Sequence, residues 1–419
     1  MHDPAVTPQD CNAAGILRRL DDLANCTDVP GEITRLFLSP AHRQATDLVI
    51  TWMTHAGLHA TLDPSGTVVG RLPAAAPDAP VVMLGSHIDT VRNAGRYDGC
   101  LGVVMAIALA AHFGPAKLPF TLEIRAFGDE EGVRFPVTMT SAHAAAGSFD
   151  SAWLATTDAD GKTLRQALQD FGLDPEKLRQ GACAAHAAAY LEIHIEQGPV
   201  LEAHGAPLGI VTAINGAARL AVSVQGSAGH AGTVPMNARA DALTAAAAMV
   251  LAAEAIARAH PPAVATVGQL KITPNATNVI PGNCHFTLDV RAPTDAQRDA
   301  VAHDIATTLA TIAGQRGVTL DWRQTHQAGA VACDTILRAC LAEAIAKLDL
   351  PVIALPSGAG HDAMVMAAHC PVAMLFLRCR GGISHHPAEH VTEADVAAAL
   401  AVMTQLLASF GEKGNWLPK

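Results

Sequence analysis

The chain lacks any tract of clustered positive charge. Its 28 Lys and Arg residues are outnumbered by 39 Asp and Glu, which leaves a formal net charge of −11 at pH 7. Nucleic acids and anionic membrane surfaces are usually bound through basic patches. We therefore expect neither nucleic acid nor a membrane as a partner, and we interpret the acidic balance as a source of solubility.

The nine cysteines lack the regular spacing of a disulfide scaffold, and no two of them form a C-x-x-C pair. Scattered cysteines in odd number suit a reducing compartment. The first residues, Met1-His2-Asp3-Pro4, also lack the basic and then apolar pattern of a secretory signal. These absences predict a cytoplasmic protein.

Long uninterrupted apolar runs are also missing. The alanine-rich segment 242–259 comes nearest, but Glu254 and Arg258 interrupt it, so we expect a helix of a soluble domain rather than a membrane span. The sequence has no internal repeats. The chain has 419 residues, half of them hydrophobic, which is more than one hydrophobic core usually contains. Its length therefore predicts two domains.

A buried strand that ends in polar residues is the first informative feature present. Val81-Val82-Met83-Leu84 is an apolar run typical of a parallel strand covered on both faces. It leads into a glycine-rich loop, residues 85–99, which carries His87, Asp89 and Asp98. Ligands of open α/β sheets gather outside the carboxyl ends of the strands. The loop therefore predicts half of a metal site.

Carboxylates also follow the next apolar strand, Thr121–Phe127, at Glu130 and Glu131. Adjacent side chains of an extended segment point in opposite directions, so one glutamate can bind a metal while the other faces a substrate water. Taken alone, such an acidic run is more often a solvated turn.

A third strand, Tyr190–Glu196, alternates apolar residues with Glu192, His194 and Glu196. A half-solvated strand would explain this pattern without any metal. The last strand, Ala373–Leu377, leads to His385.

Together these strands deliver five nitrogen and oxygen donors to one predicted sheet edge: His87, Asp98, Glu131, His194 and His385. Imidazole and carboxylate ligands without thiolate suit Zn²⁺, Mn²⁺, Co²⁺ or Ni²⁺. Two such ions need a bridging ligand, and we choose the carboxylate of Asp98.

The order of predicted strands and helices changes near residue 213. From there the elements follow the order βαββαβ of a ferredoxin-like unit. Strands are expected at 219–225, 266–272, 285–291 and 318–322, and helices at 239–259 and 294–314. We predict a discontinuous α/β catalytic domain, residues 1–212 and 329–419, with an inserted α+β domain at 213–328. The insertion would act as a lid or as a dimer contact.

The chain resembles the amidase/hydantoinase-carbamoylase branch of the M20 metallopeptidase-like family from about residue 15 to 410. The resemblance is carried by the segments G-S-H-I-D-T-V, G-D-E-E-G-V-R-F-P, E-I-H-I-E-Q-G-P-V-L-E, G-S-A-G-H-A-G-T-V-P-M, N-V-I-P-G, S-G-A-G-H-D-A and G-G-I-S-H-H-P-A-E. That branch includes N-carbamoyl-L-amino-acid hydrolases and allantoate amidohydrolases. It implies an aminopeptidase-like mixed-sheet catalytic domain and a ferredoxin-like dimerisation domain.

Carried over by motif, the resemblance implies two divalent metal ions per subunit. One would be held by His87 and His194 and the other by Glu131 and His385, with Asp98 bridging. Glu130 matches the family's general base. Asp89 fits as the carboxylate that orients the His87 ring.

The resemblance also assigns residues to the substrate. His230 matches a donor to the oxyanion that reaches the site from the neighbouring subunit, which implies a homodimer. Arg291 is our choice for a substrate carboxylate, because its guanidinium can bind one in a bidentate manner. Asn278 and Gln197 offer amides to a ureido group. The remaining candidates form one turn: Gly358, Ala359 and His361.

These residues predict metal-dependent hydrolysis of a linear amide or ureido C–N bond in a carboxylate-bearing substrate. Allantoate and N-carbamoyl-L-amino acids fit equally, with release of ammonia and CO₂ or of a ureido product. An M20-type exopeptidase or N-acyl-amino-acid deacylase would use the same metals and Glu130. A non-catalytic dimeric binding protein is the third reading, and it predicts a broken ligand set.

Overall fold

The structure, a computed structural model, describes residues 11–183 and 187–412, and these form two compact units. Unit 1 contains the described residues up to Thr212, together with Cys333–Leu355 and the residues from Gly360 on. Unit 2 contains Ala213–Ala332 and Pro356–Ala359. Unit 2 extends past residue 328 because β14 (Val331–Ala332) pairs with the end of β6 (Leu208–Ile214).

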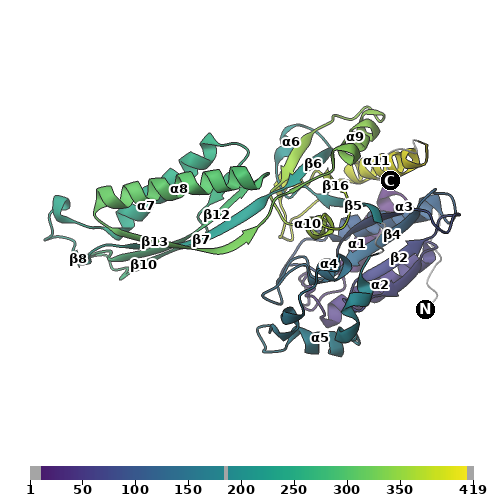
Figure 1. The fold of residues 1–419 in the computed structure, drawn as a ribbon, viewed down its shortest axis with the longest axis horizontal. Coiled ribbons are helices and arrows are strands. Elements are labelled where there is room, and N and C mark those ends of the chain that lie inside the picture. The colour runs from purple at the N-terminus through teal and green to yellow at the C-terminus, as the bar shows by residue number, and fades with distance from the viewer. Residues whose placement is uncertain (1–10, 184–186, 413–419) are drawn as a thin grey trace. The chain divides into compact units, whose positions relative to one another are not determined.

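A mixed sheet forms the centre of unit 1 (Figure 1), as predicted for an α/β fold. Its strands run in the spatial order β1-β2-β4-β3-β5-β16-β6, and β15 also pairs with β6. Their bounds are His59–Leu62 (β1), Val68–Leu72 (β2), Val81–His87 (β3), Thr121–Phe127 (β4), Ala187–Ile195 (β5), Ala354–Ser357 (β15) and Val372–Leu377 (β16). The four strands β4, β3, β5 and β16 are parallel to one another, so their carboxyl ends share one edge.

Helices cover both faces of this sheet. One face is covered by α1 (Ala13–Ala24), α2 (Pro40–His55), α3 (Cys100–Phe113), α9 (Thr335–Ala346) and α11 (Glu393–Glu412), whose buried residues join the strands in one cluster. On the other face α10 (Asp362–Met366) packs against β3, β5 and β16, and α4 (Thr140–Ala145) packs against α10. Shorter elements complete the unit: η2 (Ser151–Ala155), α5 (Leu164–Asp170), η3 (Pro175–Gly181), α6 (Val200–Ala203) and η5 (Arg380–Gly382).

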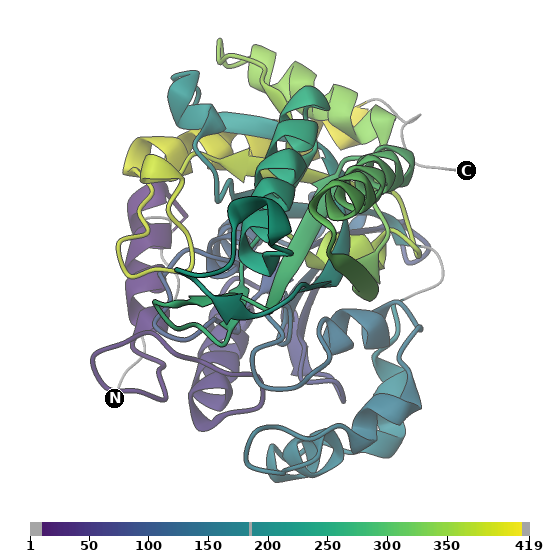
Figure 2. The ribbon, with the colours of Figure 1, turned by 90° about the vertical axis from the view of Figure 1, so that its left-hand side faces the viewer.

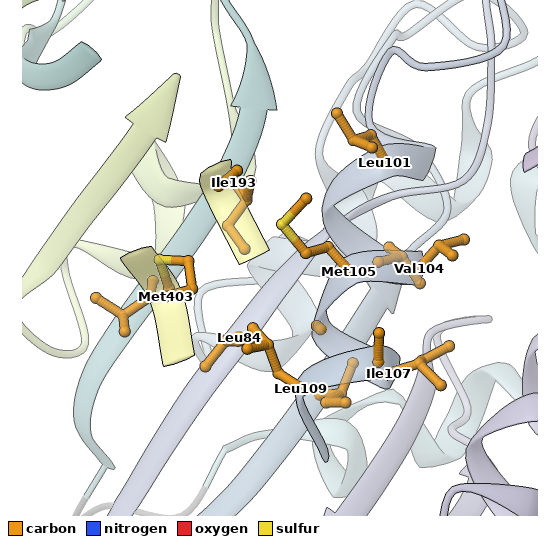
Figure 3. Close-up of a cluster of buried hydrophobic side chains, with 14 of the residues drawn as sticks. Leu84, Leu101, Val104, Met105, Ile107, Leu109, Ile193 and Met403 are labelled. Atoms are coloured by element: carbon orange, nitrogen blue, oxygen red, sulfur yellow. The ribbon is translucent and has the colours of Figure 1, made fainter. Parts of the chain in front are cut away.

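Helix α3 lies in the middle of the core, and every residue from Cys100 to Ala110 is buried. Figure 3 shows Leu101, Met105 and Leu109 of this helix beside Ile193 and Leu84 of the sheet. A helix that is apolar on all sides is typical of such a position. The helix lies so close to β5 that a Cβ atom at Gly102 would collide with the Ile193 carbonyl oxygen. This packing fixes the start of α3, directly after Asp98.

Strand β5 corrects one expectation. Its alternating pattern allowed a half-solvated strand, yet every residue from Ala188 to Ile195 is buried. The apolar residues face the helical cluster, while Glu192 and His194 face α10, where Glu192 Oε2 accepts a hydrogen bond from Ala363 N at 3.0 Å. The alternation therefore separates an apolar face from a buried polar one.

Unit 2 is built on an antiparallel sheet with the order β10-β12-β7-β13, and β9 also pairs with β12. Its main elements are β7 (Gly216–Gln225), α7 (Ala242–Ala259), β9 (Val264–Thr266), β10 (Leu270–Thr273), β12 (Asn283–Ala292), α8 (Asp295–Arg316) and β13 (Thr319–Ala328). The strand expected at 266–272 is divided into β9 and β10, and β13 continues six residues past its expected end at Trp322. A short pair, β8 (Gly229–His230) with β11 (Val279–Ile280), and η4 (Met236–Ala238) complete the unit.

The helices α7 and α8 lie side by side on this sheet (Figure 2). Two helical segments of the described chain, Ala242–Ala259 and Glu393–Phe410, are long and apolar enough to cross a membrane by length and composition. In α7 most of the buried residues, including Ala246 and Met249, belong to the hydrophobic cluster of unit 2, together with residues of its sheet. Residues of α11 such as Leu406 belong to the core of unit 1. Each segment thus packs as a core helix does.

Candidate active site

The carboxyl edge of the unit 1 sheet gathers imidazoles and carboxylates from four parallel strands. His87 is the last residue of β3, and His194 is the second-last residue of β5. Glu130 and Glu131 follow β4, and His385 lies in the loop after β16. Asp98 comes two residues before α3. All five residues of the predicted ligand set are therefore placed at one edge.

One group of three donors is fully buried. Asp98 Oδ1 lies 3.3 Å from His87 Nε2 and 3.1 Å from His194 Nε2. The two imidazole rings are 5.7 Å apart between centroids. The ligand atoms of this trio all lie within 4.8 Å of one another.

A second group shares Asp98 with the first. The other carboxylate oxygen, Asp98 Oδ2, lies 3.4 Å from His385 Nε2, and that nitrogen lies 3.4 Å from Glu131 Oε2. These three donors also lie within 4.8 Å of one another. The His385 side chain is about half exposed, at 49%, whereas Asp98 and Glu131 are almost covered, so this group faces the open side of the site.

The remaining ring nitrogens of the two buried histidines are held by the backbone. His87 Nδ1 lies 3.1 Å from the Asp89 carbonyl oxygen and 3.4 Å from its carboxylate, and His194 Nδ1 lies 2.9 Å from the Ile195 carbonyl. A carbonyl can only accept, so each Nδ1 carries the proton and each Nε2 presents the lone pair that a metal would bind. His194 Nε2 accepts a hydrogen bond from Gly99 N at 3.2 Å. The Asp89 carboxylate also accepts hydrogen bonds from the backbone N–H groups of Glu130 and Glu131 at 3.1 and 3.2 Å. Asp89 therefore holds the backbone of the loop that carries Glu130 and Glu131. It also contacts the His87 ring, which the resemblance implied that it orients.

Burial and charge shift the titration of this cluster strongly. Burial and the neighbouring Asp98 raise the pKa of Glu131 to about 9, and burial raises the pKa of Glu130 well above its usual range. Burial opposes the ionisation of Asp98, but His194 and His87 outweigh it and hold its pKa well below the ordinary value. Carboxylates crowded in this way repel one another, and a cation placed among them would remove the repulsion.

The donor set fits divalent metal ions. It consists of imidazole nitrogens and carboxylate oxygens, with Asp98 presenting one oxygen to each group. Glu131 Oε1 is buried and has no hydrogen-bond partner among the described residues, which suits an atom reserved for a ligand. A nearby thiol, Cys100 Sγ, instead accepts from Arg35 Nη2 at 3.1 Å.

Three residues around Asp98 have contacts that the sequence reasoning did not assign. Ser384 Oγ donates to Asp98 Oδ2 at 2.5 Å, and Gln197 Nε2 donates to the same oxygen at 2.8 Å. Glu389, which is 4% exposed, accepts from the backbone N–H groups of Tyr97 and Asp98. Gln197 had been singled out for the substrate only. Ser384 and Glu389 lie in the segment G-G-I-S-H-H-P-A-E. Their connection to Asp98 depends on tertiary contacts between residues more than 280 positions apart in the sequence.

His361 lies against the first metal-ligand group. Its ring meets His194 edge-on, with centroids 4.6 Å apart, and it is fully buried. Burial and the nearby His194 lower its pKa well below the usual range, so the ring is neutral. Its neighbours in the predicted turn, Gly358 and Ala359, belong to unit 2. The turn is therefore divided between the units.

Arg291 is held firmly within unit 2. Its guanidinium forms two bonds with Asp289, at 2.8 and 3.0 Å, and donates to the Gly358 carbonyl at 2.7 Å. Arg219 Nε donates to the same Asp289 carboxylate at 3.0 Å. These residues line a hollow of about 630 Å³ together with Thr266. Arg291 is thus pre-oriented, and Arg219 serves to hold Asp289.

His230 and Asn278 lie close together on unit 2. His230 pairs with Val279 in the β8–β11 ladder, and the next residue, Ala231, donates its N–H to the Asn278 carbonyl at 3.0 Å. His230 is exposed, and its Nδ1 accepts from Gly232 N at 3.1 Å. Arg239 donates to the Ala231 carbonyl at 2.6 Å and so supports this loop.

A mixed α/β sheet that collects imidazoles and carboxylates at its carboxyl edge is typical of a metal-dependent hydrolase. The sequence pattern of Peptidase family M20/M25/M40 matches residues 83–409. The chain belongs to this family. Enzymes of the family bind divalent metals, and His87, Asp98 and His194 provide matching donors.

Known relatives narrow the class further. The chain is 40% identical over 424 residues to allantoate deiminase 1 of Glycine max, which covers 93% of this chain and 88% of that protein. It is 39% identical over 390 residues to an N-carbamoyl-L-amino acid amidohydrolase of Geobacillus stearothermophilus, covering 92% and 95%. An amidase of the hydantoinase/carbamoylase family from Burkholderia multivorans matches with a TM-score of 0.90 at 32% identity, covering 96% and 98%. The resemblance drawn from the motifs is confirmed.

Proposed function

We propose that the protein is an amidohydrolase that cleaves the linear C–N bond of a ureido or carbamoyl group in a carboxylate-bearing substrate. Allantoate and N-carbamoyl-L-amino acids are the two substrate classes, because relatives at 40% and 39% identity carry these activities in their names. The observation that carries the proposal is the intact set of donors around Asp98. An exopeptidase or deacylase is not favoured by the relatives, and a non-catalytic binding protein would not need every donor.

Two metal ions per subunit are proposed, one at each group that Asp98 joins. His87 and His194 would hold the first ion and Glu131 and His385 the second, with Zn²⁺, Mn²⁺, Co²⁺ or Ni²⁺ as the suitable metals. Such ions, when bound, supply Lewis acidity that polarises a carbonyl group and makes water easier to deprotonate.

Glu130 is proposed as the general base. Its carboxylate oxygen lies 3.9 Å from His87 Nε2, so it faces the metal-ligand cluster without belonging to either trio. Asp89 accepts from the Glu130 N–H, and Thr138 Oγ1 donates to the Glu130 carbonyl, so the backbone of Glu130 is held on both sides. In this position Glu130 takes a proton from the attacking water and returns it to the leaving nitrogen.

Substrate recognition is proposed for residues of both units. Arg291, pre-oriented by Asp289, would bind the substrate carboxylate, and Asn278 and Gln197 would bind the ureido group. His361 is neutral and next to His194, so its ring can donate to or accept from the substrate. Gly358 and Ala359 would contribute backbone groups.

We further propose a cytoplasmic homodimer in which His230 of one subunit serves the site of the other. His230 is exposed on unit 2 and its ring is fixed by Gly232 N, so Nε2 is presented outwards as a donor to a developing oxyanion. Unit 2 would then act as a lid and a dimerisation domain. Sedimentation at micromolar protein concentration tests the dimer, and a monomer with full activity would contradict it.

The function is tested by metal exchange. The protein is stripped of metal by dialysis against a chelator, and Mn²⁺ or Zn²⁺ is restored while ammonia release from allantoate and from N-carbamoyl-L-amino acids is measured. We expect no release without metal and turnover of one substrate class with it. A metal-loaded protein that releases ammonia from neither class would refute the proposal, and a dipeptide and N-acetyl-amino-acid panel would then test the peptidase alternative.

A further inference from the structure

Glu389 lies four residues after His385 and is buried beneath the metal-ligand cluster. One of its carboxylate oxygens, Oε1, accepts hydrogen bonds from Tyr97 N at 2.7 Å and from Asp98 N at 3.1 Å. The other oxygen, Oε2, lies 3.3 Å from Ser384 Oγ. The Ser384 hydroxyl in turn donates to Asp98 Oδ2 at 2.5 Å. Glu389 therefore contacts both the backbone of one ligand and the residue preceding another.

These contacts close a ring between two loops that are distant in sequence. The loop before α3 supplies Asp98, and the loop after β16 supplies His385. The first loop follows β3 and the second follows β16, and β5 lies between these strands in the sheet. No helix or strand of the described chain joins the two loops directly. Their relative position at the cluster depends on side-chain contacts, of which the Glu389 bonds are the most buried.

We propose that Glu389 is a positioning residue that sets the distance between the two metal-ligand groups by fixing the Asp98 backbone against the His385 loop. This inference rests on the proposed function only in assuming that these groups bind metal. Replacing a residue that orients a metal ligand without touching the metal typically lowers metal affinity about 10- to 100-fold. Asp98 is the shared ligand, so an error in its position would affect both groups.

Gly95 supports this assignment independently. A Cβ atom at this position would collide with the Cβ, Cδ and Oε1 atoms of Glu389. The Asp98 loop therefore lies directly on the Glu389 side chain, and glycine is required for that close approach. A methyl group at Gly95 should displace Glu389 without removing its carboxylate.

The matched control is Asp63, in the turn between β1 and β2. Its Oδ1 accepts from Ser65 N at 2.8 Å, from Thr67 N at 3.1 Å and from Ser65 Oγ at 2.6 Å. Asp63 Oδ2 also lies 3.9 Å from Arg125 Nη1. Asp63→Ala thus removes, like Glu389→Ala, a buried carboxylate that accepts from two backbone N–H groups and contacts a serine hydroxyl. It does so in a turn that supplies none of the predicted metal ligands.

The experiment titrates Co²⁺ into the metal-free full-length protein and follows the visible absorption of the bound ion. We expect Glu389→Ala to weaken Co²⁺ binding at least tenfold, and Asp63→Ala to change it by less than about threefold. Both variants should lower Tm, since both leave buried N–H groups without an acceptor. Glu389→Gln keeps an oxygen for the two N–H groups and should restore affinity to within about threefold of the wild type.

Several results would overturn the proposal. These are wild-type Co²⁺ affinity in Glu389→Ala, an equal loss in Asp63→Ala, or no recovery in Glu389→Gln. If Glu389→Ala does not fold, Gly95→Ala decides, because unchanged affinity in that variant contradicts the proposal. A wild-type protein that binds no Co²⁺ also overturns it. Loss of Co²⁺ affinity in Glu389→Ala with no ammonia release by the metal-loaded wild type refutes only the proposed function, whereas release with unchanged affinity refutes only this inference.

Discussion

The two units differ most in what they bury. Unit 1 encloses many charged groups, among them Glu123, Arg125 and Asp129 as well as the metal-ligand cluster. In the described part of unit 2, the buried polar side chains are only Asn215, Arg298 and Ser357. Buried charges cost free energy unless they are paired or bound to metal. Among the described residues, most of the buried charged groups, and most of the free energy that their burial costs, are therefore found in unit 1, while unit 2 buries mainly apolar side chains.

The largest expected effect concerns Glu130, which belongs to the charged interior of unit 1. Under the proposed function, Glu130→Gln keeps the shape of the side chain and removes the base, so kcat should fall about 10²- to 10⁴-fold. Metal content, measured by elemental analysis, should stay at the wild-type level because Glu130 lies in neither trio. Full activity in this variant would show that the proton acceptor lies elsewhere.

Metal binding should change the hydrogen-exchange rates of unit 1 and leave those of unit 2 unchanged. A ligand at a thousandfold excess over its Kd stabilises the folded state by about 4 kcal/mol. Hydrogen exchange should therefore slow on metal addition in the loops at 88–99 and 378–390 of unit 1. Exchange in α7 and α8 of unit 2 should remain unchanged. Equal protection of both units would contradict an energetic separation between them.

Much of unit 1 could be predicted because parallel strands with apolar interiors are easy to identify and their carboxyl ends meet by topology. The bounds of β4 follow directly from its apolar run. Strand β3 begins with its apolar run at Val81 but continues three residues past Leu84, so His87 is its last residue and not part of the loop predicted to begin at residue 85. Ser384 and Glu389 could not be assigned, because their role depends on a contact with Asp98 that no local pattern contains. In the same way, β5 alternates as a half-solvated strand would, and only the packing of α10 reveals that both faces are buried.

The outer strands of the unit 2 sheet were harder to predict from the sequence. The strand expected at 266–272 is interrupted near Gly268, where the backbone passes from β9 to β10. The polar half of β13 carries little apolar signal, since most of its residues are exposed, yet it pairs with β7 as far as Ala328. An edge strand that is paired on one side and solvated on its face has no period that separates it from a loop.

Core truncations in the two units should have similar effects on stability and different effects on the site. Met105 in α3 and Met249 in α7 are both fully buried. Replacing either by Ala should lower the free energy of unfolding by about 2–5 kcal/mol, through lost burial and the cavity left behind. Met249→Ala should leave Co²⁺ affinity unchanged, whereas Met105→Ala, in the helix that begins after Asp98, should weaken it. Denaturant unfolding and Co²⁺ titration provide the two measurements.

The pH dependence of stability should also come from unit 1. Burial lowers the pKa of His42 from 6.5 to about 4. Between these values the unfolded chain takes up a proton on His42 that the folded protein does not, so the contribution of His42 to stability falls as the pH drops from about 6.5 to 4. The loss attributable to His42 is about 3 kcal/mol at the lower end. His42→Gln should remove this contribution from the curve of unfolding free energy against pH.

The smallest effect is expected on the surface of unit 2. Arg258 donates two hydrogen bonds to Glu254 on α7, at 2.8 and 2.7 Å, but both side chains are more than half exposed. Solvated pairs at this spacing contribute about 0.3–0.5 kcal/mol, because water and salt screen the charges and two flexible side chains must be ordered. A double-mutant cycle with Glu254→Gln and Arg258→Gln should yield that coupling at low salt and less at high salt. A coupling several times larger would mean that unit 2 also depends on charge for its stability, and the contrast between an ionic unit 1 and an apolar unit 2 would no longer hold.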